Sequence, residues 1–197
     1  MIIKLDEEYN MIDGFKIRFG CHAKHYERYD CLLLDNIKLT KIDNGNLWHK
    51  TSKRAHSGNY SFWLGDDITT KYISYTDNSL ISPKIDLINA TSASLSFWQY
   101  CDFEDYKDGG IVEISLDSGN SWRQITPNNY YDGIIDEPTN SLDSKEAFCL
   151  ATEVWEKEEF SLTPYVGYKI LLRFRFGSSA EVNKEGWYID DIAIVWG

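Results

Sequence analysis

The sequence has no run of about 18 or more apolar residues, so no segment is expected to cross a bilayer as a helix. Its first residues, MIIKLDEEYNMIDGF, lack the basic start and the continuous apolar stretch of a signal peptide. Positive charge is also scarce, because 20 Lys and Arg face 31 Asp and Glu and the formal net charge is −11. An acidic protein repels a phosphate backbone and an anionic bilayer, so neither nucleic-acid binding nor membrane insertion is expected.

The motifs of several enzyme classes are missing as well. The chain has no nucleophile elbow with a Ser-His-Asp order, no His-Glu-x-x-His zinc motif and no phosphate-binding glycine loop. It has no tandem repeat and no low-complexity tract. The sequence therefore predicts a protein that is not an enzyme, and its 197 residues predict a single domain over 1–197.

Aromatic residues, in contrast, are abundant: 7 Trp, 13 Tyr and 9 Phe, side chains that suit half-buried pleated surfaces. In the segment YKILLRFRF, the side chains of Ile170, Leu172, Phe174 and Phe176 fall on one face and basic side chains on the other. Turn tetrads such as DNGN, DSGN and KDGG separate segments of this kind. The pattern predicts an all-β fold, a two-sheet antiparallel β-sandwich or jelly roll.

The segment SLDSGNSW, residues 115–122, matches the Asp-box hairpin of sialidase-type propellers. In that turn the Asp accepts backbone hydrogen bonds, the Gly takes a left-handed conformation and the Trp packs below. A propeller needs one such hairpin in each of several blades, whereas this chain has a single copy. We therefore interpret Asp117 as a turn former, and an unrecognised carboxylate-based glycoside hydrolase remains the alternative.

Read in order, HSGNYSFWLG, NSLISPKIDL, ASLSFWQYCDFED, DGGIVEISLDSGNSW, FSLTPYVGYKILLRFRFGSS and EGWYIDDIAIVW resemble the MAM-like jelly-roll module. This module occurs in MAM domains of cell-surface receptors and as the accessory domain of immune-inhibitor-A-type secreted metallopeptidases. The match runs from about His56 to the C-terminus, while residues 1–50 match poorly.

The resemblance implies a MAM-like, galactose-binding-like jelly roll without catalytic residues. It further implies an adhesion or recognition module that binds protein or glycan at a cell surface. Such a module lies beside neighbouring domains of a larger secreted or cell-surface protein. The alternative is an accessory domain of a secreted metallopeptidase.

Four cysteines, Cys21, Cys31, Cys101 and Cys149, allow three disulfide pairings. Proximity favours Cys21 with Cys31, which leaves Cys101 with Cys149, and the order resembles that of MAM domains. Paired cysteines would indicate an oxidising, extracellular compartment, and four buried thiols are the alternative. Residues 126–152 have weak periodicity and are predicted to form a long loop or insertion, which Cys149 could tie down.

Two adjacent carboxylates, Asp190 and Asp191, lie inside the apolar segment GWYIDDIAIVW. Consecutive side chains of a strand point to opposite faces, so either face that covers the core receives an ionised group that needs a partner. Related jelly rolls hold a structural calcium ion through an acidic residue here, so we predict a calcium site at this pair. The alternative is that the two side chains cap turn amides or pair with Arg173 or Arg175.

Two further sites are considered. Exposed aromatic rings can stack on sugars, and Tyr106, Tyr130 and Tyr131 are the predicted ligand-binding residues. The segment CHAKHYERYDC contains ligand types that zinc accepts, but adjacent residues of a strand point to opposite sides, which disfavours a zinc site. The candidate ligands of this disfavoured site are Cys21, His22, His25 and Cys31.

Overall fold

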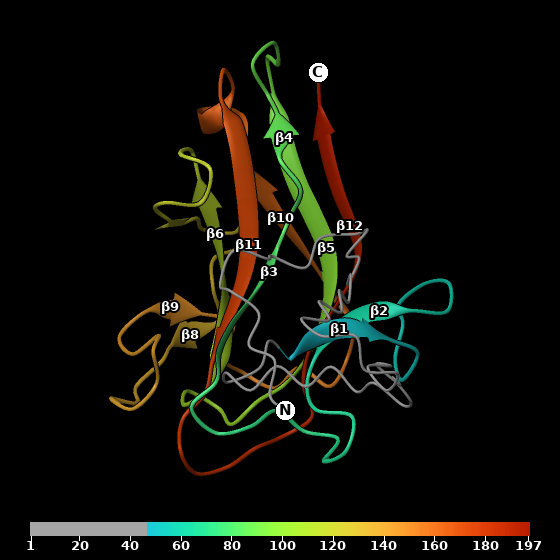
Figure 1. Cartoon of the computed structure of the whole chain (residues 1–197), viewed down its shortest axis with the longest axis vertical. Coiled ribbons are helices and arrows are strands. Elements are labelled where there is room, and N and C mark those ends of the chain that lie inside the picture. The colour runs from blue at the N-terminus through green and yellow to red at the C-terminus, as the bar shows by residue number, and fades with distance from the viewer. Residues whose placement is uncertain (1–46) are drawn as a thin grey trace, which may run out of the picture. The chain divides into compact units, whose positions relative to one another are not determined.

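The structure, a computed structural model, describes residues 47–197, and these form two antiparallel β-sheets (Figure 1). Sheet A has the strand order β1 (Trp48–Thr51), β2 (Ser61–Leu64), β12 (Gly186–Trp196), β5 (Ala93–Asp102) and β10 (Glu156–Ser161). Sheet B has the order β3 (Asp77–Ile81), β11 (Lys169–Gly177), β6 (Gly109–Ser115) and β7 (Arg123–Gln124), and β4 (Ile85–Asp86) also pairs with β11. A short 3₁₀ helix, η1 (Thr163–Tyr165), precedes β11.

The predicted all-β sandwich is confirmed. Cys21, Cys31, His22, His25 and most of the poorly matched region 1–50 lie outside the described residues. Within the part of the chain that is described, no helix is long and apolar enough to span a membrane.

The inner faces of the two sheets enclose the core. Phe97 of β5 meets Phe174 of β11 edge to face, with ring centroids 5.0 Å apart. Trp187 of β12 is completely buried and, like Phe97, contacts Phe174 from sheet A. The KDGG segment was expected to be a turn, but its two glycines lie in β6. A side chain at Gly110 would collide with the ring of Trp187, so a glycine is needed there for the sheets to approach. Each buried aromatic side chain contributes about 1.5–3 kcal/mol of hydrophobic free energy.

Strand β11 follows the predicted alternation. Its apolar side chains at 170, 172, 174 and 176 are buried, and its outward arginines are paired. Arg173 Nε donates to Glu113 at 2.6 Å, and Nε and Nη2 of Arg175 donate to the two carboxylate oxygens of Asp77 at 2.7 and 2.8 Å. The outer face of sheet B is therefore held by ion pairs.

Residues 126–152 contain a small hairpin, β8 (Gly133–Ile134) with β9 (Glu146–Ala147), and this segment covers the outer face of β6. The covering cluster is apolar and comprises Ile111 of β6 with Ile135, Leu142, Ala147 and Cys149. The segment is thus attached to the sandwich by a second, smaller core.

The SLDSGNSW turn has the predicted geometry. The Asp117 carboxylate accepts hydrogen bonds from the backbone N–H of Ser121 at 2.9 Å and from the Ser121 hydroxyl at 2.6 Å. These donors lower the pKa of Asp117 to about 2. Gly119 has a φ of +95°, which a glycine adopts without strain, and Arg173 lies 4.4 Å above the ring of Trp122. The geometry agrees with Asp117 as a turn former.

Candidate functional site

A β-bulge in β12 decides where the two adjacent carboxylates point. Asp190 pairs with Trp98 of β5, but the register shifts by one residue before Ala193 pairs with Ser96. Asp191 takes a φ of 48° within this bulge. The extra residue interrupts the alternation of side chains, so both carboxylates reach the outer face of sheet A.

There the pair holds the turn that follows β1. The backbone N–H groups of His56 and Ser57 donate to Asp190 Oδ2 at 2.7 and 3.1 Å. The Ser57 hydroxyl donates to Asp191 Oδ1 at 2.5 Å, and His56 Nδ1 lies 2.7 Å from Asp191 Oδ2. Hydrogen bonds from Ser57 and His56 hold the pKa of Asp191 below its ordinary value. The turn-capping alternative describes these contacts.

No group of three or more His, Cys, Asp or Glu side chains in residues 47–197 is arranged to hold a metal ion. Each oxygen of Asp190 and Asp191 already accepts a hydrogen bond or lies against His56. An ion would have to share these oxygens with the turn. The calcium ion at this pair stays a prediction.

The turn places its side chains on aromatic rings, of which Trp98 and Trp155 are partly exposed and Tyr100 is buried, and we call this group the platform. His56 stacks on Trp98 with ring centroids 3.8 Å apart and an interplanar angle of 12°. Trp155 meets His56 edge on at 5.8 Å, and the Arg54 guanidinium lies 4.2 Å above the ring of Tyr100. The platform consists of Arg54, His56, Trp98, Tyr100 and Trp155.

A buried layer below fixes the platform. Arg54 makes two hydrogen bonds to the Glu185 carboxylate, at 2.9 and 2.7 Å. Tyr188 is buried, stacks on Trp63 at 5.5 Å and donates its hydroxyl hydrogen to Glu185 at 2.7 Å. The hydrogen bond to Glu185 raises the pKa of Arg54, and the hydrogen bond from Arg54 lowers the pKa of Glu185. Arg54 is therefore a permanently charged group in a fixed orientation.

His56 of the platform lies beside Ser57 and Asp191, and the three are residues of the types used in serine hydrolases. Catalysis requires the histidine to lie between the other two and to accept the serine proton. Here the Ser57 hydroxyl donates to Asp191 instead, at 2.5 Å. These contacts hold the turn in place, and they differ from the Ser-to-His-to-Asp order of hydrogen bonds in serine hydrolases.

The sequence did not point to the platform. The segment ASLSFWQYC is apolar in both phases, which is typical of a central strand with two covered faces. That pattern was the only available signal for Trp98 and Tyr100. His56 and Arg54 belong to a turn whose contacts with the strand could not be inferred from spacing.

The predicted ligand-binding tyrosines do not lie in the platform. Tyr106 and Tyr130 are 48% and 75% exposed. Tyr131 is largely buried: its hydroxyl donates to the carbonyl oxygen of Ile125 at 2.8 Å and accepts from the N–H of Val112 at 3.0 Å. Burial raises the pKa of Tyr131. Tyr131 thus anchors the 126–152 segment to the core, and the binding role of the other two stays a prediction.

The expected disulfide between Cys101 and Cys149 is not formed in the structure. Both residues are free and buried. Cys101 belongs to the main core beside Gln99, whereas Cys149 belongs to the cluster over β6. Burial raises the pKa of Cys149 to about 12 and raises that of Cys101 well above its ordinary value. Hydrogen bonds and apolar contacts, rather than a cross-link, hold the segment that contains Cys149.

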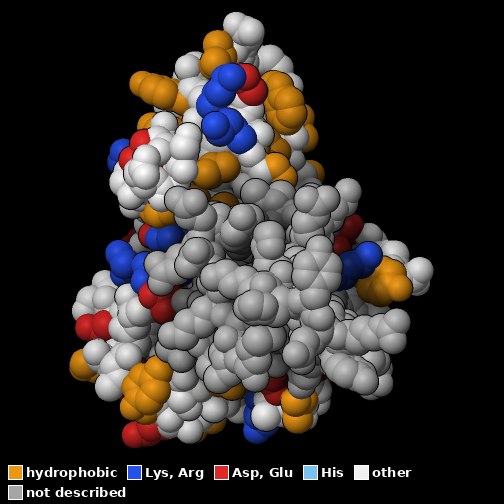
Figure 2. Space-filling model, viewed as in Figure 1, with side chains coloured by type: hydrophobic (Ala, Val, Ile, Leu, Met, Phe, Trp, Pro, Cys, Tyr) orange, Lys and Arg blue, Asp and Glu red, His pale blue; other side chains and the backbone are white. Residues whose placement is uncertain are grey.

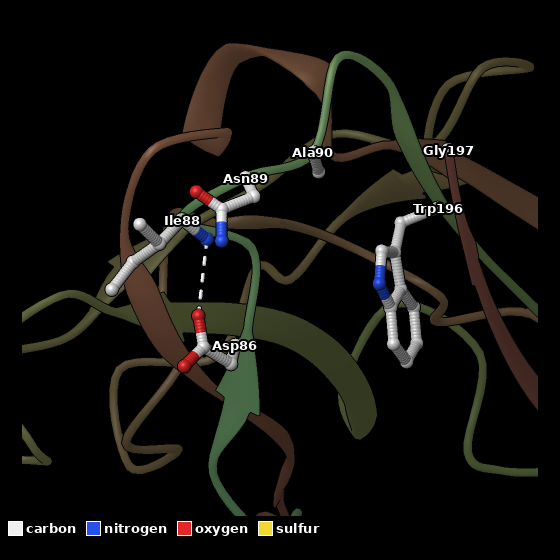
Figure 3. A pocket seen from close by; sticks show the side chains of 6 residues that line it. All are labelled: Asp86, Ile88, Asn89, Ala90, Trp196 and Gly197. Carbon is white, nitrogen blue, oxygen red and sulfur yellow. Dashed lines mark hydrogen bonds between the residues drawn. The ribbon is translucent and has the colours of Figure 1, made fainter.

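A second candidate site is an open cleft of about 280 Å³ at the end of the sandwich where β12 terminates (Figure 3). The Trp196 ring forms one side and is 53% exposed, while Asp86 and Asn89 lie across from it. Asp86 accepts a hydrogen bond from the N–H of Ile88 at 3.1 Å and lies 3.2 Å from Lys169. Figure 2 shows hydrophobic side chains gathered at this end, around a few basic ones.

Residues 49–196 match the model of the family described as immune inhibitor A-like, MAM domain. Bacillopeptidase F of Bacillus subtilis (strain 168) is 28% identical over 130 residues, which are 66% of this chain but 8% of that protein.

Two solved structures have a similar arrangement of strands. The K1 cleaved adhesin domain of Lys-gingipain from Porphyromonas gingivalis W83 is 17% identical, with a TM-score of 0.46, over 79% of this chain and 86% of that one. A carbohydrate-binding module of the β-sandwich superfamily is 9% identical, with a TM-score of 0.43, over 75% and 52% of the two chains. These similarities concern the fold alone.

Proposed function

Because the chain belongs to the immune inhibitor A-like MAM domain family, we propose that it is a non-catalytic recognition module of a larger secreted or cell-surface protein. In this proposal it binds a protein or glycan outside its own polypeptide. The match to only 8% of Bacillopeptidase F supports a module that works beside other domains. A role as an accessory domain of a peptidase is consistent with the same finding.

The platform carries the proposal. Trp and Arg are among the residues that dominate binding energy in protein interfaces, and here Arg54, Trp98 and Trp155 lie together, partly exposed, above the buried ring of Tyr100. The Glu185 clamp fixes Arg54 before any ligand arrives, so little side-chain entropy is lost on binding. His56 covers one face of Trp98, which leaves ring edges and charged groups accessible. This arrangement favours a protein ligand over a flat sugar ring.

The test is a screen of the purified chain on protein and glycan arrays, followed by affinity measurements on any ligand found. The substitution Trp98→Ala should weaken binding by about tenfold or more, since it removes a central aromatic contact. Trp196→Ala, at the far cleft, is the matched control and should leave the affinity unchanged. Turnover of an array substrate that Asp191→Asn abolishes without unfolding would make the chain an enzyme and contradict the proposal.

A glycan in the end cleft is the second candidate function, and Trp196 is the observation that favours it. An exposed indole face opposite a carboxylate and an amide can stack on a pyranose while the polar groups bind its hydroxyls. The same pair of variants separates the two candidates. A sugar in the cleft requires Trp196→Ala to abolish binding and Trp98→Ala to leave it intact.

A further inference from the structure

Two arginines of β11 point to the outer face of sheet B, and they differ in how many of their hydrogen-bond donors are used. Arg175 directs Nε and Nη2 to the two oxygens of Asp77, so a bidentate pair occupies its guanidinium. Arg173 donates only through Nε, to Glu113 Oε2 at 2.6 Å, and makes no other hydrogen bond within residues 47–197. The two Nη groups of Arg173 are therefore left without an acceptor in this part of the chain.

Two contacts fix the orientation of the Arg173 guanidinium. Its Cζ lies 4.4 Å from the centre of the Trp122 ring, and the Glu113 side chain that binds its Nε is buried. The Arg173 side chain is 19% exposed, so solvent still reaches it. A guanidinium held in this way has lost most of its side-chain entropy before a ligand arrives. Arg173 thus offers donors that are both fixed and accessible.

The charges around Arg173 are balanced, although the formal net charge of the chain is −11. Arg173 pairs with Glu113, and Arg175 pairs with Asp77, so two positive and two negative side chains lie next to each other. A carboxylate that approaches Arg173 is therefore not opposed by an excess of acidic side chains among these four. Such local complementarity governs which partner is accepted more than the net charge does.

Apolar side chains lie beside Arg173 on the same face. Ile81 of β3 is its cross-strand neighbour in the register and is 45% exposed. Leu171, two positions earlier in β11, is on this face as well and is partly exposed. The guanidinium already covers a face of the Trp122 ring, which leaves less of that ring for a sugar to stack on. The surroundings favour a ligand with a carboxylate next to an apolar group.

We propose that Arg173 binds the carboxylate of an Asp or Glu side chain in a protein ligand. The Nη groups donate to the carboxylate oxygens while Nε stays with Glu113, and Ile81 and Leu171 contact an apolar neighbour of the bound residue. This site lies on the outer face of sheet B, whereas the platform lies on the outer face of sheet A. It is thus a second recognition point, separate from the one proposed above. A short peptide that makes this one contact should bind weakly, with a dissociation constant of about 1 mM.

The experiment is an NMR titration of the isotope-labelled whole chain with two capped peptides. One peptide has a single Glu between Leu residues, and the other has Gln in its place. The Glu peptide should shift the Arg173 Nε–H and Trp122 indole N–H signals until they saturate, and the Gln peptide should bind about tenfold more weakly. Arg173→Lys should weaken binding of the Glu peptide by about tenfold, because lysine keeps the charge but lacks the planar pair of donors. Arg175→Lys is the matched control and should leave the affinity unchanged, since Asp77 occupies that guanidinium.

Equal affinity for the two peptides overturns the proposal, and this comparison does not depend on any variant folding. An Arg173→Lys chain that binds the Glu peptide as the unchanged chain does overturns it too. Glucuronate is the third probe: if it shifts the same two signals more strongly than the Glu peptide does, the site takes an acidic glycan and the assignment to a protein ligand is wrong. No shift with any probe at about 10 mM is likewise a refutation. Trp98→Ala leaves Arg173 untouched, so this proposal and the one for the platform fail separately.

Discussion

Replacing Glu158 by Gln should remove a pH-dependent loss of stability. Glu158 lies in β10, half-buried against the core, where Gln99 Nε2 donates to its Oε1 at 3.1 Å. Burial raises the pKa of Glu158 to about 7, and the charges of Glu156 and Asp132 add to the rise. The side chain therefore exchanges its proton near neutral pH in the folded chain.

The direction of the effect follows from the raised pKa. The folded chain holds the proton more tightly than the unfolded chain, so the stabilisation is complete below pH 4.5 and is lost as the pH rises through about 7. A pKa difference of one unit corresponds to about 1.36 kcal/mol. The rise of the Glu158 pKa from 4.5 to about 7 therefore sets an upper limit of about 3.4 kcal/mol on this stabilisation. Because the side chain remains in partial contact with water, we expect about 1–2 kcal/mol.

Urea unfolding at pH 5 and pH 8 measures this difference. The stability of the unchanged chain relative to Glu158→Gln should fall by about 1–2 kcal/mol between the two pH values. Glu159→Gln, in the next position of β10, is the control, because Glu159 is half exposed and paired with Lys157. If the chain and Glu158→Gln lose or gain stability in parallel from pH 5 to pH 8, the reasoning from burial is refuted.

Two other predictions concern the two buried cysteines and the turn at Asp117. In a chain that carries Cys21→Ser and Cys31→Ser, Cys101 and Cys149 should react slowly with a thiol reagent when folded and rapidly after unfolding, and a reducing agent should leave the melting temperature unchanged, because both are buried free thiols of raised pKa. A melting temperature of this variant that falls on reduction would instead indicate a disulfide between Cys101 and Cys149. Asp117→Asn should lower the melting temperature at pH 7. The hydrogen-bonded carboxylate has a lowered pKa, so this difference should disappear between about pH 4 and pH 2. A difference that persists at pH 2 would show that the charge of Asp117 does not stabilise the turn.

The fold could be predicted because its signals are local. The alternation in β11 and the turn chemistry around Asp117 each depend on a few neighbouring residues, and both agree with the structure. The order of such segments was enough to indicate the MAM-like sandwich. Two-residue periodicity and tight turns are properties that a sequence carries without knowledge of distant contacts.

The candidate sites depended on contacts between distant segments and were harder to predict. The alternation rule placed Asp190 and Asp191 on opposite faces, and the bulge brings both to the same face. Tyr131 belongs to the irregular segment 126–152, so no periodic pattern indicated that its side chain packs against the core. The platform requires a turn 42 residues before Trp98 to fold over it, as the contact of His56 shows.

The bulge also has a consequence for insertions and deletions. Strand β12 pairs with β5 in one register up to Asp190 and in a register shifted by one from Ala193 onward. Deleting Asp191 would join the two registers into an uninterrupted strand, with Ile194 still opposite Leu95 and the core unchanged. We therefore expect a chain without this residue to keep the sandwich, but the turn at His56 would then be held by one carboxylate instead of two. The extra residue in β12, rather than the core residues of that strand, therefore determines how many hydrogen bonds hold His56 of the platform in place.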